Sequence, residues 1–125
     1  MAKLLIVEDD ESTREFLKFV LENAGHQVSA AADGQAALDA VSKNPPELIL
    51  LDIMLPEIHG FEVCHRLKSD PATQKVKIVM LSAKSFPADI KQARHMGADG
   101  FLAKPVNPAE LINGLKAVLT GQSLF

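Results

Sequence analysis

Five short apolar runs alternate with stretches of helical periodicity, and this alternation restricts the fold more than any other feature of the chain. In four of the five helical stretches, apolar residues recur mainly at spacings of three and four, which is typical of helices with one face against a core. Strands that alternate with helices predict a parallel sheet with right-handed crossovers and helices on both faces. The apolar runs cover residues 4–7, 27–31, 48–51, 77–81 and 100–103.

Glycine and asparagine mark the ends of the predicted helices. Gly25 and Gly97 follow the first and fourth helical stretches, and Asn107 is placed to cap the fifth. Five strand–helix units favour an α/β fold, a (βα)5 doubly wound parallel sheet of flavodoxin-like strand order 2-1-3-4-5. We expect residues 1–125 to form a single domain, in which residues 122–125 are too short to fold alone.

Composition excludes several classes of function. The apolar share is 47% and the charged share 23%, which is typical of a globular domain. The net charge of −3 gives little attraction to nucleic acid, and a single cysteine allows no internal disulfide or thiolate metal cluster. Because no apolar run approaches the ~20 residues of a membrane span and no secretory signal is visible, we expect no membrane contact and a cytoplasmic location.

Polar residues follow four of the five predicted strands. Glu8–Glu11 follow the first strand, Asp52 the third, Ser82 the fourth and Lys104 the fifth. In an open parallel sheet the carboxyl ends of the strands lie at one edge, where ligands bind. Each residue also has an ordinary explanation, such as acids at a helix start, a turn serine or a solvated lysine. Their joint occurrence favours a site.

The chemistry of this set of residues points to phosphoryl transfer. Clustered carboxylates repel one another unless a cation lies between them, and oxygen ligands without histidine or cysteine favour Mg²⁺ or Mn²⁺. The lysine and the serine can both bind an incoming phosphoryl group. An aspartate carboxylate is a nucleophile in such reactions, where catalysis is mostly positioning and charge stabilisation.

From Leu4 to about Leu119, the sequence strongly resembles the receiver domain of two-component response regulators, with the chemotaxis regulators as its single-domain form. The acid pair alone would be a weak signal, whereas the four motifs in order are highly specific. The motifs are Ile6-Val7-Glu8-Asp9-Asp10, Leu51-Asp52-Ile53-Met54-Leu55-Pro56 with Gly60, Leu81-Ser82-Ala83, and Lys104-Pro105.

The resemblance implies a role for each motif residue. Asp52 is the expected phosphoacceptor. Mg²⁺, or Mn²⁺ in its place, is expected to bind to Asp9 and Asp52, to Glu8 directly or through water, and to the backbone carbonyl of Met54. The spacing to Asp52 favours Glu8 and Asp9, rather than Asp9 and Asp10, as the acid pair of the family.

The resemblance also implies a switch. Ser82 is expected to donate to the phosphoryl group, Lys104 to pair with it, and the bond before Pro105 to be cis. Phosphorylation would draw Ser82 toward the phosphate and let Phe101 rotate inward. The surface of helix four, strand five and helix five, roughly residues 86–119, would then change its binding to a downstream effector protein.

The implied function is that of a signalling module and not of an enzyme. It takes a phosphoryl group from a sensor histidine kinase or a histidine phosphotransfer protein, or by autophosphorylation from small donors, and loses it by autodephosphorylation. Met54 and Lys84 occupy the two positions that tune this loss in the family. Because neither is an amide or an acid, we expect slower loss than in relatives with Asn or Glu there.

Several alternatives stay open from the sequence. The chain is either a complete regulator or the receiver of a longer protein with a DNA-binding or enzymatic output domain, and either a monomer or a phosphorylation-dependent dimer. A small aspartyl phosphatase of the haloacid dehalogenase type would need a second acid where Met54 stands. A flavin- or nucleotide-binding module would need a phosphate loop in place of the acids after strand one. The remaining residues considered are interpreted as surface or core: Arg14, His26, His59, Cys64, His65 and His95.

Overall fold

The computed structural model describes residues 2–83 and 87–125. Within these residues, strands and helices alternate along the whole chain, as the apolar pattern predicts. Lys84, predicted to tune the phosphoryl lifetime, and Phe86, at the start of the predicted output surface, lie outside the described residues. The elements are β1 (Lys3–Val7), α1 (Glu11–Asn23), β2 (Gln27–Ala31), α2 (Gly34–Lys43), β3 (Leu48–Asp52), α3 (Gly60–Ser69), β4 (Lys77–Ser82), α4 (Pro87–His95), β5 (Gly100–Ala103) and α5 (Pro108–Leu119).

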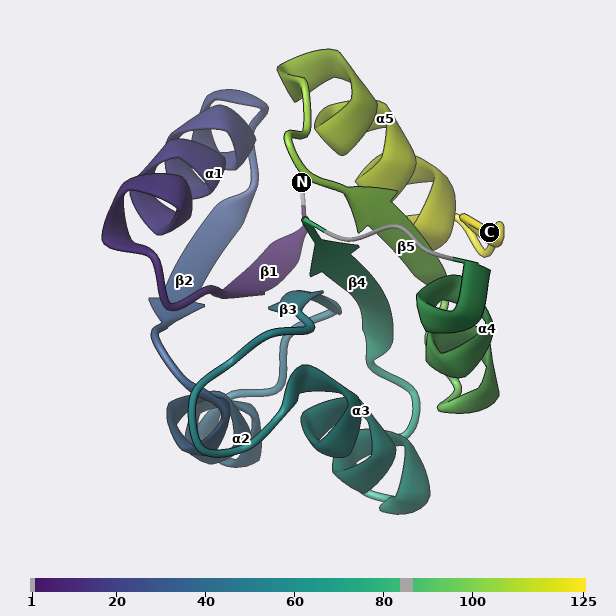
Figure 1. Cartoon of the computed structure of the whole chain (residues 1–125). Coiled ribbons are helices and arrows are strands. Elements are labelled where there is room, and N and C mark those ends of the chain that lie inside the picture. Colours follow the sequence, from purple (N-terminus) through teal and green to yellow (C-terminus); the bar gives the residue numbers. More distant parts are fainter. Residues whose placement is uncertain (1, 84–86) are drawn as a thin grey trace.

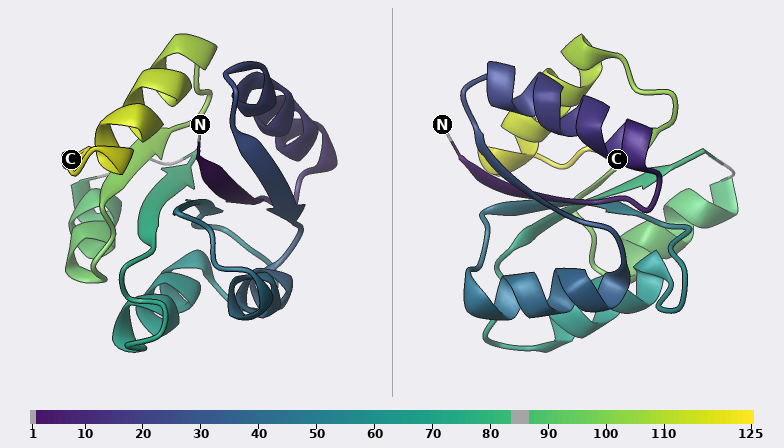
Figure 2. Two further views of the ribbon diagram at one scale, coloured as in Figure 1. Left: turned by 180° about the vertical axis from the view of Figure 1, so that it is seen from behind. Right: turned by 90° about the vertical axis from the view of Figure 1, so that its left-hand side faces the viewer.

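The strands form one parallel sheet in the order β2-β1-β3-β4-β5, which confirms the predicted topology (Figure 1). Helices α1 and α5 cover one face of the sheet, and α2, α3 and α4 cover the other (Figure 2). The strands run in one direction, so their carboxyl ends lie at the same edge. In the register of the central pair, Asp52 at the end of β3 lies opposite Leu81 of β4.

Two apolar cores lie on the two faces of the sheet, because successive side chains of a strand point to opposite sides. In β1, Leu4 and Ile6 pack on the side of α1 and α5, whereas Leu5 and Val7 pack on the side of α2, α3 and α4. Both cores hold the central strands rigidly in place. They therefore fix where the strand ends, and the polar residues that follow them, lie.

Helix α1 differs in part from its predicted apolar stripe. Leu17, Val20 and Leu21 are buried as the periodicity predicts, but Phe16 is 46% exposed and Ala24 is exposed. The buried stripe of α1 is therefore narrower than its apolar pattern. No helix among the described residues has the length and apolarity needed to span a membrane.

Candidate functional site

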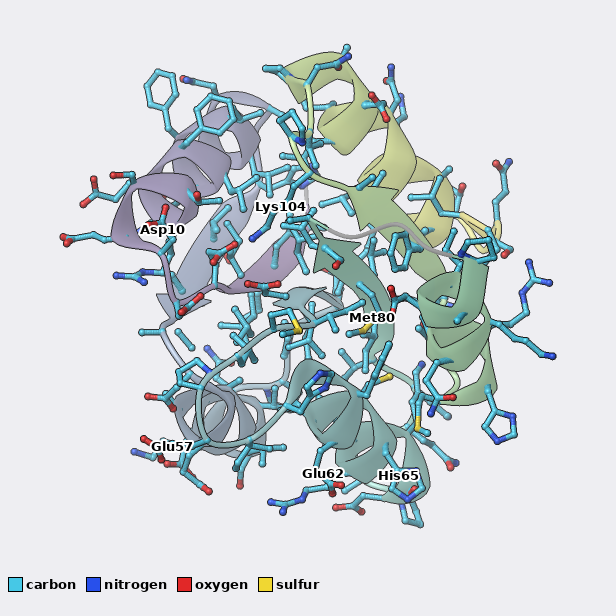
Figure 3. All side chains as sticks on the ribbon, viewed as in Figure 1. Asp10, Glu57, Glu62, His65, Met80 and Lys104 are labelled. Atoms are coloured by element: carbon cyan, nitrogen blue, oxygen red, sulfur yellow. The ribbon has the colours of Figure 1, made fainter. Side chains whose placement is uncertain are left out.

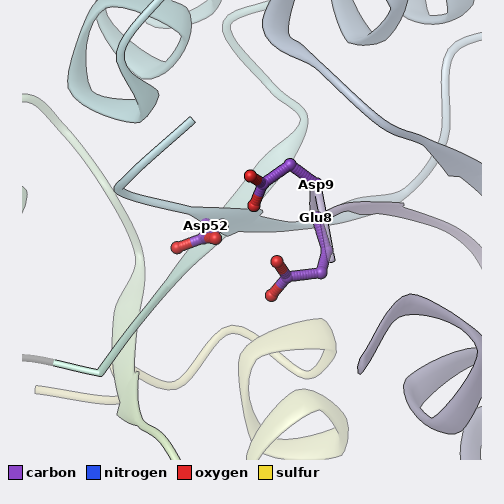
Figure 4. A group of neighbouring side chains, drawn as sticks. All are labelled: Glu8, Asp9 and Asp52. Atoms are coloured by element: carbon purple, nitrogen blue, oxygen red, sulfur yellow. The ribbon is translucent and has the colours of Figure 1, made fainter. Parts of the chain in front are cut away.

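Three carboxyl groups meet at the carboxyl-end edge of the sheet. Glu8 directly follows β1, Asp9 comes next, and Asp52 is the last residue of β3. Each offers a carboxylate oxygen within 4.8 Å of the others, and Figure 4 shows the three groups around a common space. Glu8 is 1% and Asp52 3% exposed, whereas Asp9 is exposed. The edge therefore concentrates negative charge in a largely buried place.

Lys104, which follows β5, brings an ammonium group into this cluster. Its Nζ lies 2.5 Å from Oε1 of Glu8 and 3.3 Å from Oδ2 of Asp52. Figure 3 shows its side chain near the middle of this edge, whereas Glu57, Glu62 and His65 lie at the periphery. The predicted convergence of Glu8, Asp52 and Lys104 is thus present in the structure.

Backbone geometry beside the sheet directs Lys104 toward the carboxylates. The Lys104 N–H donates to the carbonyl of Ser82 at 2.8 Å, which continues the pairing of β5 with β4 by one step. The following bond, Lys104–Pro105, is cis.

The electrostatics of the cluster favour the charged form of the lysine. Burial by itself lowers the pKa of Lys104, but its close contact with Glu8 and the charges of Asp52 and Glu8 outweigh it and raise that pKa. Lys104 therefore stays an ammonium group throughout the physiological range. It offsets part of the negative charge of the three carboxylates.

Local hydrogen bonds orient the two buried acids. The Asp10 N–H donates to Oε2 of Glu8 at 3.1 Å, and the Met54 N–H donates to Oδ1 of Asp52 at 3.2 Å. Arg14 of α1 donates to the carbonyl of Glu8 at 2.8 Å. Arg14, interpreted from sequence as a solvated helix residue, therefore supports the loop that carries Glu8. No sequence signal distinguishes it, since the contact depends on where α1 lies.

The loop after Asp52 needs glycine at its end. The Gly60 N–H donates to the carbonyl of Ile53 at 2.8 Å. A Cβ on Gly60 would lie 2.7 Å from Cα of Ile53 and would also collide with the carbonyl of Asp52. Only glycine therefore allows α3 to start this close to β3, and this contact holds Asp52 at the edge.

The other predicted site residues come from β4, from the loop after β3 and from β5. Ser82 is buried at the end of β4, one residue beyond the partner of Asp52 in the strand register. Met54 lies in the loop after β3 with 57% of its surface exposed. Phe101, in β5, is partly buried against the core of α2, α3 and α4.

The donor set fits a hard divalent cation. Oε1 of Glu8 is buried and, within residues 2–83 and 87–125, has no aligned hydrogen-bond donor, although it is in ion-pair contact with Lys104. Two further carboxylates supply oxygen ligands beside it. Such a set, without nitrogen or sulfur, suits Mg²⁺ or Mn²⁺ with waters in the remaining positions.

A comparison with known protein families identifies the family of this chain. A family model described as the response regulator receiver domain matches residues 4–116. The chain belongs to this family. It is a receiver domain of the kind found in two-component response regulators, which are signalling modules that interact with histidine kinases and effectors. The classes of aspartyl phosphatase and flavin-binding module are thereby set aside.

Curated relatives are longer than this receiver domain. It is 39% identical over 95% of its length to the transcriptional regulatory protein AfsQ1 of Streptomyces coelicolor, covering 52% of that protein. It is 41% identical over 93% of its length to the phosphate regulon transcriptional regulatory protein PhoB of Pseudomonas aeruginosa, covering 51% of it. The chain thus spans about half the length of these curated relatives.

Solved structures of similar proteins match its size more closely. The chemotaxis protein CheY4 of Vibrio cholerae is 34% identical with a TM-score of 0.90, covering 94% of this chain and 98% of that one. A response regulator structure from Chloroflexus aurantiacus is 38% identical with a TM-score of 0.91, covering 95% and 98%. The fold of the receiver domain is therefore the one predicted from the order of its strands.

Two histidines have backbone partners, whereas His65 and His95 are exposed. His26 Nδ1 accepts from the Ala2 N–H at 3.1 Å, and His59 Nδ1 accepts from the Phe61 N–H at 3.1 Å at the start of α3. Burial raises the pKa of the Cys64 thiol to about 11, so little of it is thiolate near neutral pH.

Proposed function

We propose that the receiver domain takes a phosphoryl group onto Asp52 from a phosphohistidine of a sensor histidine kinase or histidine phosphotransfer protein. The phosphorus–nitrogen bond of the donor breaks as a bond forms between phosphorus and the Asp52 carboxylate, and the electron pair returns to the donor imidazole. The observation that carries this proposal is the buried cluster of Glu8, Asp9 and Asp52 with Lys104 in contact.

The residues of the cluster have complementary roles in this reaction. Mg²⁺, or Mn²⁺ in its place, held by the three carboxylates and the carbonyl of Met54, would offset the negative charge on the transferring phosphoryl oxygens. Lys104 exchanges its contact with Oδ2 of Asp52 for a phosphoryl oxygen. The hydroxyl of Ser82 donates to another. These groups are already oriented by the strand ends, so little reorganisation precedes the reaction.

The signal leaves the site through β4 and β5. Ser82 moves toward the phosphoryl group, and Phe101 turns into the space that this movement opens. The described part of the output surface, α4, β5 and α5, then changes its affinity for an effector protein. We propose protein–protein contact as the direct output of this domain, because its net charge of −3 favours no nucleic acid.

The phosphoryl group is proposed to be long-lived. Met54, exposed beside Asp52, has no group that can orient a water for attack on the phosphorus. Lys84, the other tuning position, lies outside the described residues, and its contribution stays a prediction.

The lengths of the relatives favour a second domain organisation as well, in which the receiver domain is part of a longer protein. Proteins 39–41% identical to this chain are about twice as long and are named transcriptional regulators. We therefore propose two possible contexts, a regulator of this length that acts on a separate effector and a receiver joined to an output domain. An immunoblot of the native protein distinguishes them by size. The domain limits of 1–125, the monomer or dimer state and the cytoplasmic location stay predictions.

Titration with beryllofluoride, which mimics a phosphoryl group on a carboxylate, tests the proposed function. We expect NMR shifts of the amides at residues 52–54 and 82–83 that require Mg²⁺ and are absent in Asp52→Asn. The matched control is Asp99→Asn, an aspartate outside the cluster, which should respond like the wild type. A wild-type spectrum that does not change, or an unchanged response in Asp52→Asn, contradicts the proposal.

A further inference from the structure

The residues after α5 turn back along the outer edge of β5. Gly121 has a φ of 95°, its N–H donates to the carbonyl of Val118, and the Gln122 N–H donates to the carbonyl of Ala117. This pair of bonds is the Schellman arrangement that ends a helix and reverses the chain. It directs residues 121–125, which we name the strap, toward β5.

The strap forms backbone hydrogen bonds with β5. The Leu124 N–H donates to the carbonyl of Asp99 at 3.0 Å, and the Phe101 N–H donates to the carbonyl of Leu124 at 3.0 Å. Leu124 forms a parallel bridge with Gly100. An edge strand normally offers such groups to another chain, and here the strap takes them. The sequence predicts that residues 122–125 are too short to fold alone, and Leu124 is indeed ordered through its pairing with β5.

Two glycines make the space for the side chain of Leu124. A Cβ on Gly100 would lie 2.5 Å from Cβ of Leu124, and a Cβ on Gly114 would lie 3.0 Å from its Cδ2. The next residue, Phe125, has its ring centre 4.9 Å from Cζ of Arg94 on α4. The strap therefore contacts α4, β5 and α5 together, and Figure 1 shows it beside these three elements.

The strap is held by few contacts. Gln122 and Ser123 are exposed, Phe125 is 36% exposed, and Leu124 is only partly buried. A segment with few buried contacts opens locally at a lower free energy than the core. An open surface hollow of about 670 Å³ lies between the strap and α5, lined in part by Gly114, Leu124 and Phe125.

We propose that the strap is an autoinhibitory element that covers the α4–β5–α5 surface at rest and is released when Asp52 is phosphorylated. The inference rests on the proposed function, in which Phe101 turns inward. The N–H of that same residue donates to the carbonyl of Leu124, so a shift of the β5 backbone that accompanies the rotation of Phe101 weakens the hold on the strap. Because coupling between two sites is reciprocal, loosening the strap must also favour the activated state at Asp52.

Beryllofluoride binding and amide hydrogen exchange together test the strap. In the wild type, beryllofluoride with Mg²⁺ is expected to speed exchange of the Leu124 N–H about ten-fold. Leu124→Asp, which places a charge in the glycine-lined space, is expected to bind beryllofluoride about ten-fold more tightly. Ser123→Asp adds the same charge to an exposed position and is expected to stay within about two-fold of the wild type.

The outcomes separate the strap from the proposed function. A wild-type protein that shows the Mg²⁺-dependent shifts near Asp52, but unchanged exchange at Leu124, overturns the strap alone. So does equal affinity in Leu124→Asp and Ser123→Asp. Because the exchange measurement needs no substitution, it decides the question even if Leu124→Asp fails to fold. A wild type without any shift near Asp52 overturns the proposed function instead, and the coupling with it.

Discussion

Two lysine–aspartate pairs lie at opposite ends of the strands of the same sheet. They differ in how many of their charged atoms have hydrogen-bond partners. At the amino ends of β4 and β5, Nζ of Lys68 lies 3.0 Å from Oδ2 of Asp99 and also donates to the carbonyls of Val76 and Gln74. The same oxygen of Asp99 accepts from the Ile78 N–H at 2.8 Å. This network ties α3 to the strands.

The pair at the carboxyl ends of the strands carries more negative than positive charge. Lys104 contacts both Glu8 and Asp52, with Asp9 close by, and Oε1 of Glu8 has no aligned donor within the described ranges. A completed network of polar groups indicates a structural role, whereas an excess of one charge in a buried place indicates a site that binds something. The comparison therefore assigns stability to Lys68–Asp99 and chemistry to the Lys104 cluster.

The largest expected difference between the pairs is in phosphorylation. Lys104→Met should slow labelling by acetyl phosphate about 100-fold, or about 2.7 kcal/mol, because a positioned cation is lost from the transition state. Lys68→Met, the same change at the other pair, should stay within about two-fold of the wild-type rate. Intact-mass time courses measure both rates. Similar rates for the two variants would remove the basis of the comparison.

The next difference is in the sign of the stability change. Asp99→Asn should lower the free energy of unfolding by about 2 kcal/mol, less than for a fully buried pair because both side chains are partly exposed. Asp52→Asn in metal-free buffer should raise it by about 1 kcal/mol, since repulsion among the carboxylates falls while Lys104 keeps Glu8. Urea denaturation measures both. A loss of stability in Asp52→Asn would show that its cluster is also a structural pair.

Mg²⁺ should stabilise one edge of the sheet and not the other. At ten times its dissociation constant, a bound ion adds about 1.4 kcal/mol and raises the melting temperature by about 5 °C. Asp9→Asn should lose most of this shift. Asp99→Asn should keep the shift, although its melting temperature without Mg²⁺ is lower than that of the wild type. Thermal scans with Mg²⁺ and with EDTA measure the effect. An undiminished shift in Asp9→Asn would place the ion elsewhere.

The smallest expected effect concerns pH and arises at His26, outside both pairs. Burial, with the charge of the chain's amino terminus, lowers the pKa of His26, and the neutral ring accepts from the Ala2 N–H. Its contribution to stability is present above about pH 6.5 and falls as pH drops through the lowered value. His26→Gln, whose amide oxygen can still accept, should flatten the melting temperature between pH 7 and pH 5. An unchanged slope would contradict the assignment of this pH dependence to His26.

The fold and the membership of the site were predictable because their signals are local. Each strand is largely an apolar run, each polar residue lies at the end of its strand or just after it, and parallel topology brings Glu8, Asp52 and Lys104 together. Gly121 and Gly97 likewise end their helices through their own backbone conformation. The roles of these residues in phosphoryl transfer stay predictions that only chemistry can test.

The features that sequence could not predict depend on tertiary placement. Arg14 reaches the carbonyl of Glu8 only because α1 folds back over β1, and Lys68 reaches Asp99 across 31 positions. Phe16 continues an apolar pattern but is 46% exposed. The strap depends on Gly100 and Gly114 leaving space for Leu124, which no periodicity reveals.

The most direct test of the account is to locate the phosphorylated residue chemically. The receiver domain is incubated with acetyl phosphate and Mg²⁺, reduced with borohydride so that an acyl phosphate becomes homoserine, and then digested and sequenced by mass spectrometry. The account predicts homoserine at position 52 alone, in a yield that falls to background when EDTA replaces Mg²⁺. Homoserine at Asp9 or Asp99, or none at Asp52 with Mg²⁺ present, would contradict it.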